Sequence, residues 1–450
     1  MRHAVKGAST WVDKQDETPE RVSPMSVSVD LNQVILALTD ALDLVGIDET
    51  AHGKRVGYMA FICAEHLGRD KPQRERLFNI GLLHDVGVSS SVEHHNLVNE
   101  LQWDGAQDHA TEGANLLASL PLFADYSDAI RYHHTAWQDL QGVNTYTALD
   151  ANLIFLVDRV DSLAAPHYGK DLLAEVPAIR ETLKSFSGTL FAPELVELFL
   201  EASSADAFWM MLEPPHLERF ILDMERRYDE LPLNFAELKQ LAGIFAHVVD
   251  AKSRFTVQHS YGVASLARHL AELQQLSREQ AEKIEIAGLL HDVGKLRIPD
   301  EILEKPGPLD EKERRAMRRH SFETYQVLRR IDGLSDIALW AAYHHETTDG
   351  MGYPFRRQNN ELSIEARIIA VADIFQALAQ DRPYRTQLPA EQIIGILEKL
   401  AENHKLDMGV VTTVRDNLDS CFRAATLQHA PLYRSTRHQA FDRQILPQAK

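Results

Sequence analysis

The sequence has little of what several classes of protein require. Cysteine occurs only twice in 450 residues, as Cys63 and Cys421, which excludes a disulfide framework and a thiolate zinc site. No stretch approaches the ~18 apolar residues of a membrane span, and the N-terminus has no signal-peptide pattern. Positive charge is in deficit, with 47 Lys and Arg against 66 Asp and Glu, which disfavours binding to nucleic acid polymers. These absences predict a cytoplasmic protein that binds neither a membrane nor a nucleic acid polymer.

Most of the chain has the periodicity of helices, and strand-like alternation is scarce. We therefore expect an all-α fold of two tandem helical domains, joined by a connecting helix near the Pro-Pro pair at 214–215. Both ends of the chain are polar and aperiodic, which is typical of disordered segments. The expected division is a disordered leader over 1–25, a first domain over 26–213, a connecting helix within 214–234, a second domain over 235–425 and a polar tail over 426–450.

The two halves repeat each other. The heptapeptide GLLHDVG occurs at 81–87 and again at 288–294, and histidines and aspartates recur around it in the same order and at similar spacing. Chance recurrence of a core-helix pattern would preserve the apolar positions but not these polar ones, so the sequence indicates an internal duplication. The recurring positions are His52, His84, Asp85, His109, His133, His134 and Asp158 in the first copy, and His259, His291, Asp292, His320, His344, His345 and Asp373 in the second.

These residue types suit a pair of divalent cations. An aspartate can bridge two cations through its two oxygens, and neutral imidazoles fill the remaining positions. Any one of these histidines alone is more simply a satisfied core residue, but the whole set recurs in order. Mixed nitrogen and oxygen ligands favour iron, manganese, nickel or zinc without choosing among them, and paired metals suit phosphodiester hydrolysis. In the second copy, one ion is expected on His259, His291, Asp292 and Asp373, and the other on Asp292, His320, His344 and His345.

Further motifs of the second half make the pattern specific. With them, the region from about Phe235 to Ala401 resembles the HD-GYP phosphodiesterase family, a branch of the HD metal-dependent phosphohydrolases. The resemblance implies an all-helical fold and hydrolysis of bacterial cyclic dinucleotides to linear 5′-phosphorylated dinucleotides. The tandem architecture also resembles bacterial 3′3′-cGAMP phosphodiesterases. The motifs are HDVGK at 291–295, IPDEILEKPGPL at 298–309, HHETTDGMGYP at 344–354 and DRPYR at 381–385.

The resemblance also implies residues that contact the substrate. Lys295, just past the predicted ligands, would neutralise a non-bridging phosphate oxygen. Arg382 and Arg385 fall where the family places phosphate-contacting cations. Tyr353 of the Gly-Tyr-Pro segment would stack on or hydrogen-bond the ligand, or equally serve in a rigid turn. We interpret the basic run Arg314, Arg315, Arg318 and Arg319 as a solvated helix face, with attraction of an anionic ligand as the alternative.

Three positions of the second half depart from the family pattern. Phe255 stands where some members have a glutamate that supports a third metal, so two metal ions are expected. Ser253 and Gln376 replace aspartates that in the family lie near the bases. Because glutamine can pair with adenine, we expect Gln376 and Ser253 to contact a base and 3′3′-cGAMP to be a good substrate.

The first copy keeps every ligand position but has Val88 in place of Lys295, and HHTAWQDLQG in place of the Gly-Tyr-Pro segment. A valine offers no charge to a phosphate, so catalysis there is disfavoured. Three interpretations stay open, in order of preference. The first half is a metal-pinned structural partner, a regulatory ligand site or a second enzyme.

Two other functions remain for the whole chain. It could bind a cyclic dinucleotide without hydrolysing it, although the intact ligand set and Lys295 argue against a pure receptor. It could hydrolyse another nucleotide, such as a deoxynucleoside triphosphate, although the Gly-Tyr-Pro segment argues against that substrate. Contact with cyclic dinucleotide synthases is compatible with catalysis, and the sequence does not indicate the oligomeric state.

Overall fold

The computed structural model describes residues 26–45, 51–88, 90–99, 103, 105–225, 231–252, 258–380 and 386–427. Across these ranges almost all of the regular secondary structure is helical, which confirms the predicted all-α fold. The described strands form one small antiparallel pair, β1 (Ser26–Val29) with β2 (Leu231–Asn234). Among the helices of the described ranges, none combines the length and apolar character that a membrane crossing needs.

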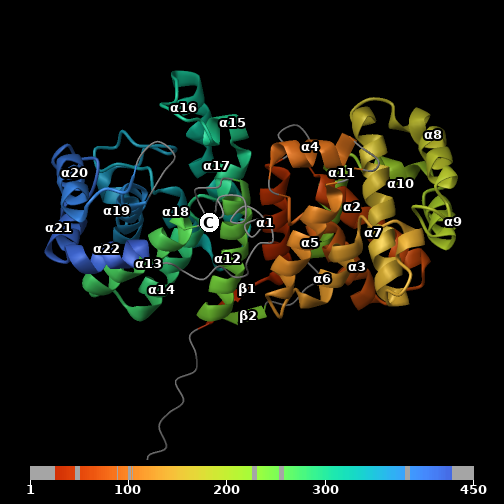
Figure 1. Cartoon of the computed structure of the whole chain (residues 1–450), viewed down its shortest axis with the longest axis horizontal. Helices are drawn as coiled ribbons and strands as arrows, with labels where there is room; N and C mark the ends of the chain where they lie inside the picture. Colours follow the sequence, from red (N-terminus) through yellow and green to blue (C-terminus); the bar gives the residue numbers. More distant parts are fainter. Residues whose placement is uncertain are drawn as a thin grey trace, which may run out of the picture.

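The first half of the chain forms the helices drawn in orange and yellow in Figure 1. Within it, α2 and α3 pack against each other, and α7 packs against both. Its helices are α1 (Leu31–Asp43), α2 (His52–His66), α3 (Lys71–Leu83), α4 (Ser91–Asn99), α5 (Ala106–Ala118), η1 (Ala124–Tyr126), α6 (Ser127–Tyr132), η2 (Trp137–Asp139), α7 (Thr145–Ala164), η3 (Ala165–His167), α8 (Leu172–Ser185), α9 (Pro193–Ala202), α10 (Asp206–Met210) and α11 (Pro214–Glu225).

The second half forms the green and blue helices of Figure 1. Here α13 and α14 pack together as α2 and α3 do in the first half, and α19 packs against both. Its helices are α12 (Phe235–Lys252), α13 (His259–Leu273), α14 (Arg278–Leu290), η4 (Val293–Arg297), α15 (Asp300–Leu303), α16 (Glu311–Met317), α17 (Arg319–Leu328), α18 (Ser335–Ala342), η5 (Asn359–Glu361), α19 (Ile364–Ala379), α20 (Ala390–Glu402), α21 (Met408–Asp416) and α22 (Leu418–Thr426).

The repeated heptapeptide has the same structural role in both halves. Its first glycine allows two helices to approach closely, because a Cβ on Gly81 would lie 2.7 Å from Gly57 Cα and one on Gly288 would lie 2.8 Å from Ala264 Cα. The helix that carries it starts in each half at a capping box and ends at the histidine of the His-Asp pair. The motif is therefore a close helix contact followed by a helix end that presents His-Asp.

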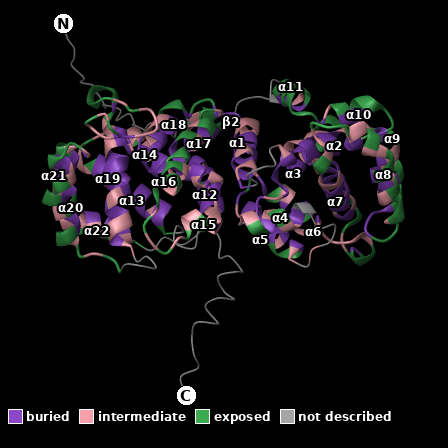
Figure 2. Cartoon of the chain, turned by 90° about the horizontal axis from the view of Figure 1, so that it is seen from above, coloured by how far each residue is buried: buried purple, intermediate pink, exposed green. Residues whose placement is uncertain are grey.

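The two halves are joined along α1 and α12, which lie between them in both views (Figures 1 and 2). Helix α1 packs against α17 and η4 of the second half, and one hydrophobic core cluster runs through both halves. Polar contacts supplement this packing: Arg330 pairs with Asp40 at 3.0 Å, and the Gln33 amide donates to Asp332 at 2.9 Å. The described halves therefore form one packed body.

Candidate metal centres

The predicted ligands of the second half stand mostly at helix ends. At a helix end a side chain can turn toward neighbouring helices, whereas adjacent residues within a helix diverge. All of them are buried except His345, which is partly exposed. They lie on α13 (His259), after α14 (His291 and Asp292), on α17 (His320), after α18 (His344 and His345) and on α19 (Asp373).

The ligand atoms of these residues converge. The two oxygens of Asp292 face different histidines, since Oδ2 lies 3.1 Å from His291 Nε2 and Oδ1 lies 3.6 Å from His320 Nε2. A carboxylate placed in this way can bridge two cations. The structure thus brings together the residues that the sequence assigns to two ions. Atoms within 4.8 Å of one another form the groups His259, His291 and Asp373; His291, Asp292 and His344; and His320, His344 and His345.

Backbone carbonyls orient the rings of His291, His320 and His344. In each ring Nδ1 lies close to the carbonyl oxygen three residues earlier, at 2.7 Å for His291 and 2.6 Å for both His320 and His344. A carbonyl can only accept, so Nδ1 carries the proton and Nε2 keeps its lone pair. The Nε2 of His291 is buried without a hydrogen-bond partner. These rings therefore present the nitrogen lone pairs that a cation needs.

The charge states also suit a cation. Burial disfavours the imidazolium form and, with neighbouring histidines, lowers the pKa of His320 to about 3 and that of His345 to about 4. Burial acts to raise the pKa of Asp292, but His291 and Lys295 hold it well below its usual range. Neutral imidazoles and ionised carboxylates form the donor set of a divalent transition metal site, so the residues present fit such ions.

The first half has an equivalent cluster. The two oxygens of Asp85 again face different histidines, since Oδ1 lies 3.2 Å from His109 Nε2 and Oδ2 lies 3.5 Å from His84 Nε2. His52 Nε2 lies 3.5 Å from Asp158 Oδ1. Atoms within 4.8 Å of one another form the groups His52, His84 and Asp85, and Asp85, His109, His133 and His134.

A small cavity lies beside this first cluster. The buried side chain of Val88 lines a cavity of about 20 Å³ together with His52, His84, Asp85 and, from α4, His94. The ring centroid of His94 lies 6.5 Å from that of His52. A cavity of this size holds a water molecule but not a nucleotide.

Comparison with known proteins agrees with this duplicated architecture. Two family models described as HD domain match residues 50–165 and 243–410. The chain is 37% identical to 3′3′-cGAMP-specific phosphodiesterase 1 of Vibrio cholerae over 397 residues, which cover 87% of this chain and 92% of that protein. The chain belongs to the HD-GYP family of cyclic dinucleotide phosphodiesterases.

This HD-GYP phosphodiesterase is also similar to two further proteins. The crystal structure of a cyclic GMP-AMP specific phosphodiesterase of V. cholerae, V-cGAP3, superposes with a TM-score of 0.61 at 25% identity and covers 88% of this chain and 98% of that one. A cyclic di-GMP phosphodiesterase of Pseudomonas aeruginosa is 38% identical over 144 residues, or 31% of this chain and 34% of that protein. The likeness to V-cGAP3 therefore extends over both halves, whereas that to the P. aeruginosa protein covers about a third of the chain.

Lys295 of this HD-GYP phosphodiesterase lies at the centre of the second half. It stands on η4, and its Nζ lies 2.5 Å from Asp292 Oδ2. Its side chain is partly exposed, so the ammonium group can reach both the ligand cluster and the solvent side. The structure therefore places the ammonium group of Lys295 beside the aspartate that is predicted to be shared by the two ions.

Gln376, predicted to contact a base, lies against a predicted metal ligand, and its base contact stays a prediction. Its side chain is buried, and its Oε1 lies 2.6 Å from His259 Nδ1. An amide oxygen can only accept, so His259 donates and directs Nε2 toward Asp373, 3.2 Å away. Gln376 therefore orients a predicted ligand, because its place on α19 directs its side chain at His259 on α13.

In the first half, the carboxylate of Asp161 takes the place that Gln376 has in the second half. Asp161 Oδ2 lies 2.7 Å from His52 Nδ1, and Asp161 also accepts hydrogen bonds from Arg55 at 2.6 Å and the Tyr168 hydroxyl at 2.5 Å. Burial lowers the pKa of His52, but Asp161 outweighs it and raises that pKa to about 9. The sequence contained this signal, because Asp161 follows Asp158 at the spacing at which Gln376 follows Asp373.

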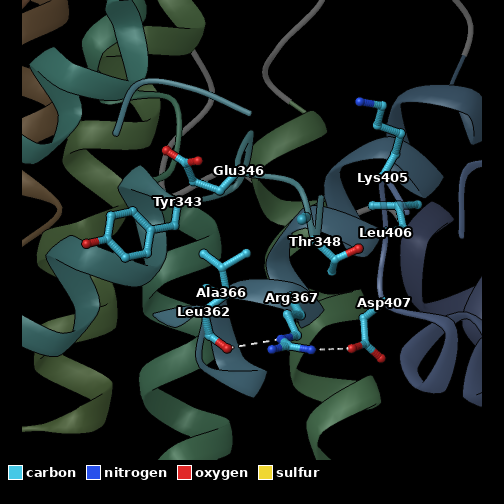
Figure 3. Close-up of a pocket in the computed structure, with 10 residues that line it drawn as sticks. Tyr343, Glu346, Thr348, Leu362, Ala366, Arg367, Lys405, Leu406 and Asp407 are labelled. Atoms are coloured by element: carbon cyan, nitrogen blue, oxygen red, sulfur yellow. Dashed lines mark hydrogen bonds and ion pairs between the residues drawn. The ribbon is translucent and has the colours of Figure 1, made fainter. Parts of the chain in front are cut away.

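Glu346, which the sequence analysis did not identify, fixes the loop that follows the Gly-Tyr-Pro segment. The buried carboxylate of Glu346 accepts backbone N–H groups of Phe355 at 2.7 Å, Arg356 at 3.1 Å and Arg357 at 3.0 Å. Figure 3 shows Glu346 at a hollow whose floor is closed by the ion pair of Arg367 with Asp407 at 2.6 Å. The hollow measures about 10 Å³, which is too small for a nucleotide.

Tyr353 faces the ligand cluster from this loop. Its ring centroid lies 4.8 Å from that of His345 and 6.4 Å from that of His320. The guanidinium of Arg318 lies over the same ring at 5.1 Å. A larger cavity of about 500 Å³ opens beside Tyr353.

Four residues of the sequence predictions lie outside the described residues. They are Ser253, Phe255, Arg382 and Arg385. The base contact of Ser253, the absence of a third metal ligand at Phe255 and the phosphate contacts of the two arginines therefore stay predictions.

Proposed function

We propose that residues 235–425 hydrolyse a bacterial cyclic dinucleotide, 3′3′-cGAMP or c-di-GMP, to a linear 5′-phosphorylated dinucleotide. The observation that carries this proposal is the position of Asp292, between two groups of histidines and in contact with Lys295. That arrangement joins a two-cation donor set to a partly exposed ammonium group that can also reach a phosphate.

Two divalent ions are proposed, one on each side of Asp292. Iron, manganese, nickel and zinc all suit the donor set. Ions held there would activate the attacking water and offset the negative charge of the phosphate. The proposed ligands are His259, His291, Asp292 and Asp373 for one ion, and Asp292, His320, His344 and His345 for the other.

The chain's own residues have complementary tasks in this reaction. Lys295 neutralises a non-bridging oxygen of the phosphate, where negative charge grows as water adds to phosphorus. The bond from phosphorus to the 3′ oxygen breaks, and that oxygen leaves as a hydroxyl with a proton derived from the water. Tyr353 lies against His345 at the edge of the cluster and limits how the ligand can approach.

The substrate proposal rests on the relatives, because the adenine contact of Gln376 stays a prediction. The V. cholerae relative that matches 87% of the chain is named for 3′3′-cGAMP, so we propose that substrate first and c-di-GMP as the alternative. The cytoplasmic location and contact with cyclic dinucleotide synthases stay predictions.

Turnover of 3′3′-cGAMP and c-di-GMP, measured side by side with the products resolved by chromatography, tests the proposal. We expect a linear dinucleotide from 3′3′-cGAMP and loss of turnover on treatment with a chelator. Binding without any linear product would identify a receptor, and preferential cleavage of a deoxynucleoside triphosphate would identify a different HD phosphohydrolase. Faster cleavage of c-di-GMP would reverse the order of the two substrates.

For the first half we propose a metal-pinned structural partner. Its donor set matches that of the second half, while Val88 removes the phosphate-binding cation and the cavity beside it excludes a nucleotide. The proposed ligands are His52, His84, Asp85, His109, His133, His134 and Asp158. A regulatory ligand site and a second enzyme are the less favoured assignments.

Paired variants separate the two halves. His291→Ala is expected to abolish turnover and to remove metal from the second half. His84→Ala is expected to remove metal from the first half, as measured by elemental analysis, while the folded protein keeps its turnover. Loss of turnover in His84→Ala with retention in His291→Ala would reverse the assignment.

A further inference from the structure

The cavity beside Tyr353 has a charge unlike that of the molecule as a whole. In a chain of net charge −19, four arginines line this one cavity of about 500 Å³. They come from the end of α16, from α17 and from the loop that follows Gly-Tyr-Pro. The cavity is lined by Arg315, Arg318, Arg319, Arg356, Phe322, Glu323 and residues 351–354.

Two of these arginines have no carboxylate partner within 4.0 Å among the described residues, namely Arg318 and Arg356. Arg315 pairs with Glu311 at 2.8 Å and Arg319 with Glu323 at 3.4 Å, so their charges are partly offset. Arg318 instead lies over the face of Tyr353. An uncompensated guanidinium pair in a concave site favours an anion with several oxygens.

The backbone conformation of the loop fixes the position of Arg356. Its backbone has a φ of 53°, in the left-handed region that a side chain of this size rarely adopts. Glu346 accepts its N–H and those of both neighbours, which holds this conformation. The loop therefore presents Arg356 at a defined place.

The same cavity offers a surface for a nucleobase. Phe322 is 43% exposed and Met351 67% exposed, although both are large apolar side chains. Nucleobases stack on exposed aromatic rings and on guanidinium planes. Anion-binding and stacking groups thus lie in one cavity, next to a tyrosine that contacts the ligand cluster.

We propose that this arginine cavity binds the half of the dinucleotide whose phosphate is not being cleaved, with Arg318 and Arg356 on that phosphate and Phe322 against its base. This inference rests on the proposed function. The cavity volume matches that of small-molecule sites, and its contact with Tyr353 connects it to the predicted catalytic ions.

The test measures steady-state kinetics and nucleotide binding in the full chain loaded with metal. Arg318→Ala and Arg356→Ala should each raise KM about tenfold with kcat and metal content unchanged, because they remove binding that is equal in the ground and transition states. Phe322→Ala should also raise KM. Arg314→Ala is the matched control, since Arg314 lies on α16 outside the cavity and donates to the Leu309 carbonyl.

A second measurement, calorimetric binding of AMP and GMP, does not require turnover. Weaker binding in the double variant Arg318→Ala/Arg356→Ala than in Arg314→Ala supports the cavity. Wild-type KM and wild-type mononucleotide binding in the double variant would overturn it. If the wild-type chain cleaves no cyclic dinucleotide, the proposed function fails, and the mononucleotide binding still decides whether the cavity is a nucleotide site.

Discussion

Gln376 and Asp161 occupy equivalent places in the two halves but differ in charge. Each accepts from the Nδ1 of the first predicted ligand, His259 or His52. A carboxylate makes the imidazole a stronger ligand than a neutral amide does, because it stabilises positive charge on the ring. The second half should therefore hold its ions less tightly than the first.

Substitution of Gln376 tests this positioning role. Gln376→Ala should weaken metal binding at the second half by about 10- to 100-fold, the usual cost of losing such an orienting partner. Gln376→Glu should strengthen it. Competition with a calibrated chelator measures both effects. A change in the ratio of 3′3′-cGAMP to c-di-GMP turnover with unaltered metal affinity would instead support the predicted base contact.

A second prediction for a single residue concerns Lys295, whose ammonium group is expected to stabilise the transition state. Lys295→Ala should lower kcat by about 10- to 1,000-fold, as expected for one lost electrostatic contact to the transition state. Metal content, measured by elemental analysis, should stay unchanged. Lys283→Ala is the control, since Lys283 pairs with Glu279 on α14 at 2.8 Å. Unchanged kcat in Lys295→Ala would remove its role.

At the scale of elements, the turn η4 determines where Lys295 lies. A Cβ on Gly294 would collide with the backbone oxygen of His320 and lie 2.7 Å from Thr324 N, so η4 and α17 touch through their backbones. Thr324 reinforces the contact by accepting from Gly294 N–H at 2.9 Å. The glycine therefore positions Lys295 and His320 relative to each other.

Gly294→Ala should push η4 from α17. We expect a loss of about 1–3 kcal/mol in the free energy of unfolding, as for other overpacked sites, together with a large fall in kcat. Gly307→Ala is the control, since a Cβ there meets no atom within 4 Å. Urea unfolding and turnover measure the two effects. Equal stability of both variants would contradict the close contact.

At the scale of the whole molecule, Asp300 links the halves. Its carboxylate accepts the N–H of Ser91, the first residue of α4, at 3.0 Å and so caps a helix of the other half. The buried Lys252 lies 3.5 Å from Asp300 and donates to the Leu296 carbonyl on η4 at 2.5 Å. The helix that carries His94 is thus tied to the segment that carries Lys295.

Two substitutions at Asp300 separate the cap from the charge. Asp300→Asn should keep the cap but leave Lys252 buried without a carboxylate, whereas Asp300→Ala should lose both. The additional loss in Asp300→Ala should be about 0.5–2 kcal/mol of unfolding free energy, the range for helix caps. Asp139→Ala, an exposed aspartate on η2, is the control. Equal unfolding curves for the two Asp300 variants would argue against the cap.

The sequence by itself determined the helical class, the duplication and the grouping of ligands. Helical periodicity and recurring spacings can be read directly along the chain. Residues such as His291 and Asp292 come directly after a predicted helix, so the sequence also shows that they lie at its end. Membership of the cluster could be predicted because the whole set repeats in the other half, whereas its division between two ions stays a prediction.

Only the tertiary structure decided which partner each side chain takes. Gln376 meets His259 across 117 positions, and Ser91 meets Asp300 across 209. Contacts of this kind depend on how helices are rotated and packed, which spacing along the chain does not encode. The four arginines at 314–319 are exposed, as predicted for a solvated helix face. That Arg356 of a distant loop lines one cavity with three of them followed only from the tertiary structure.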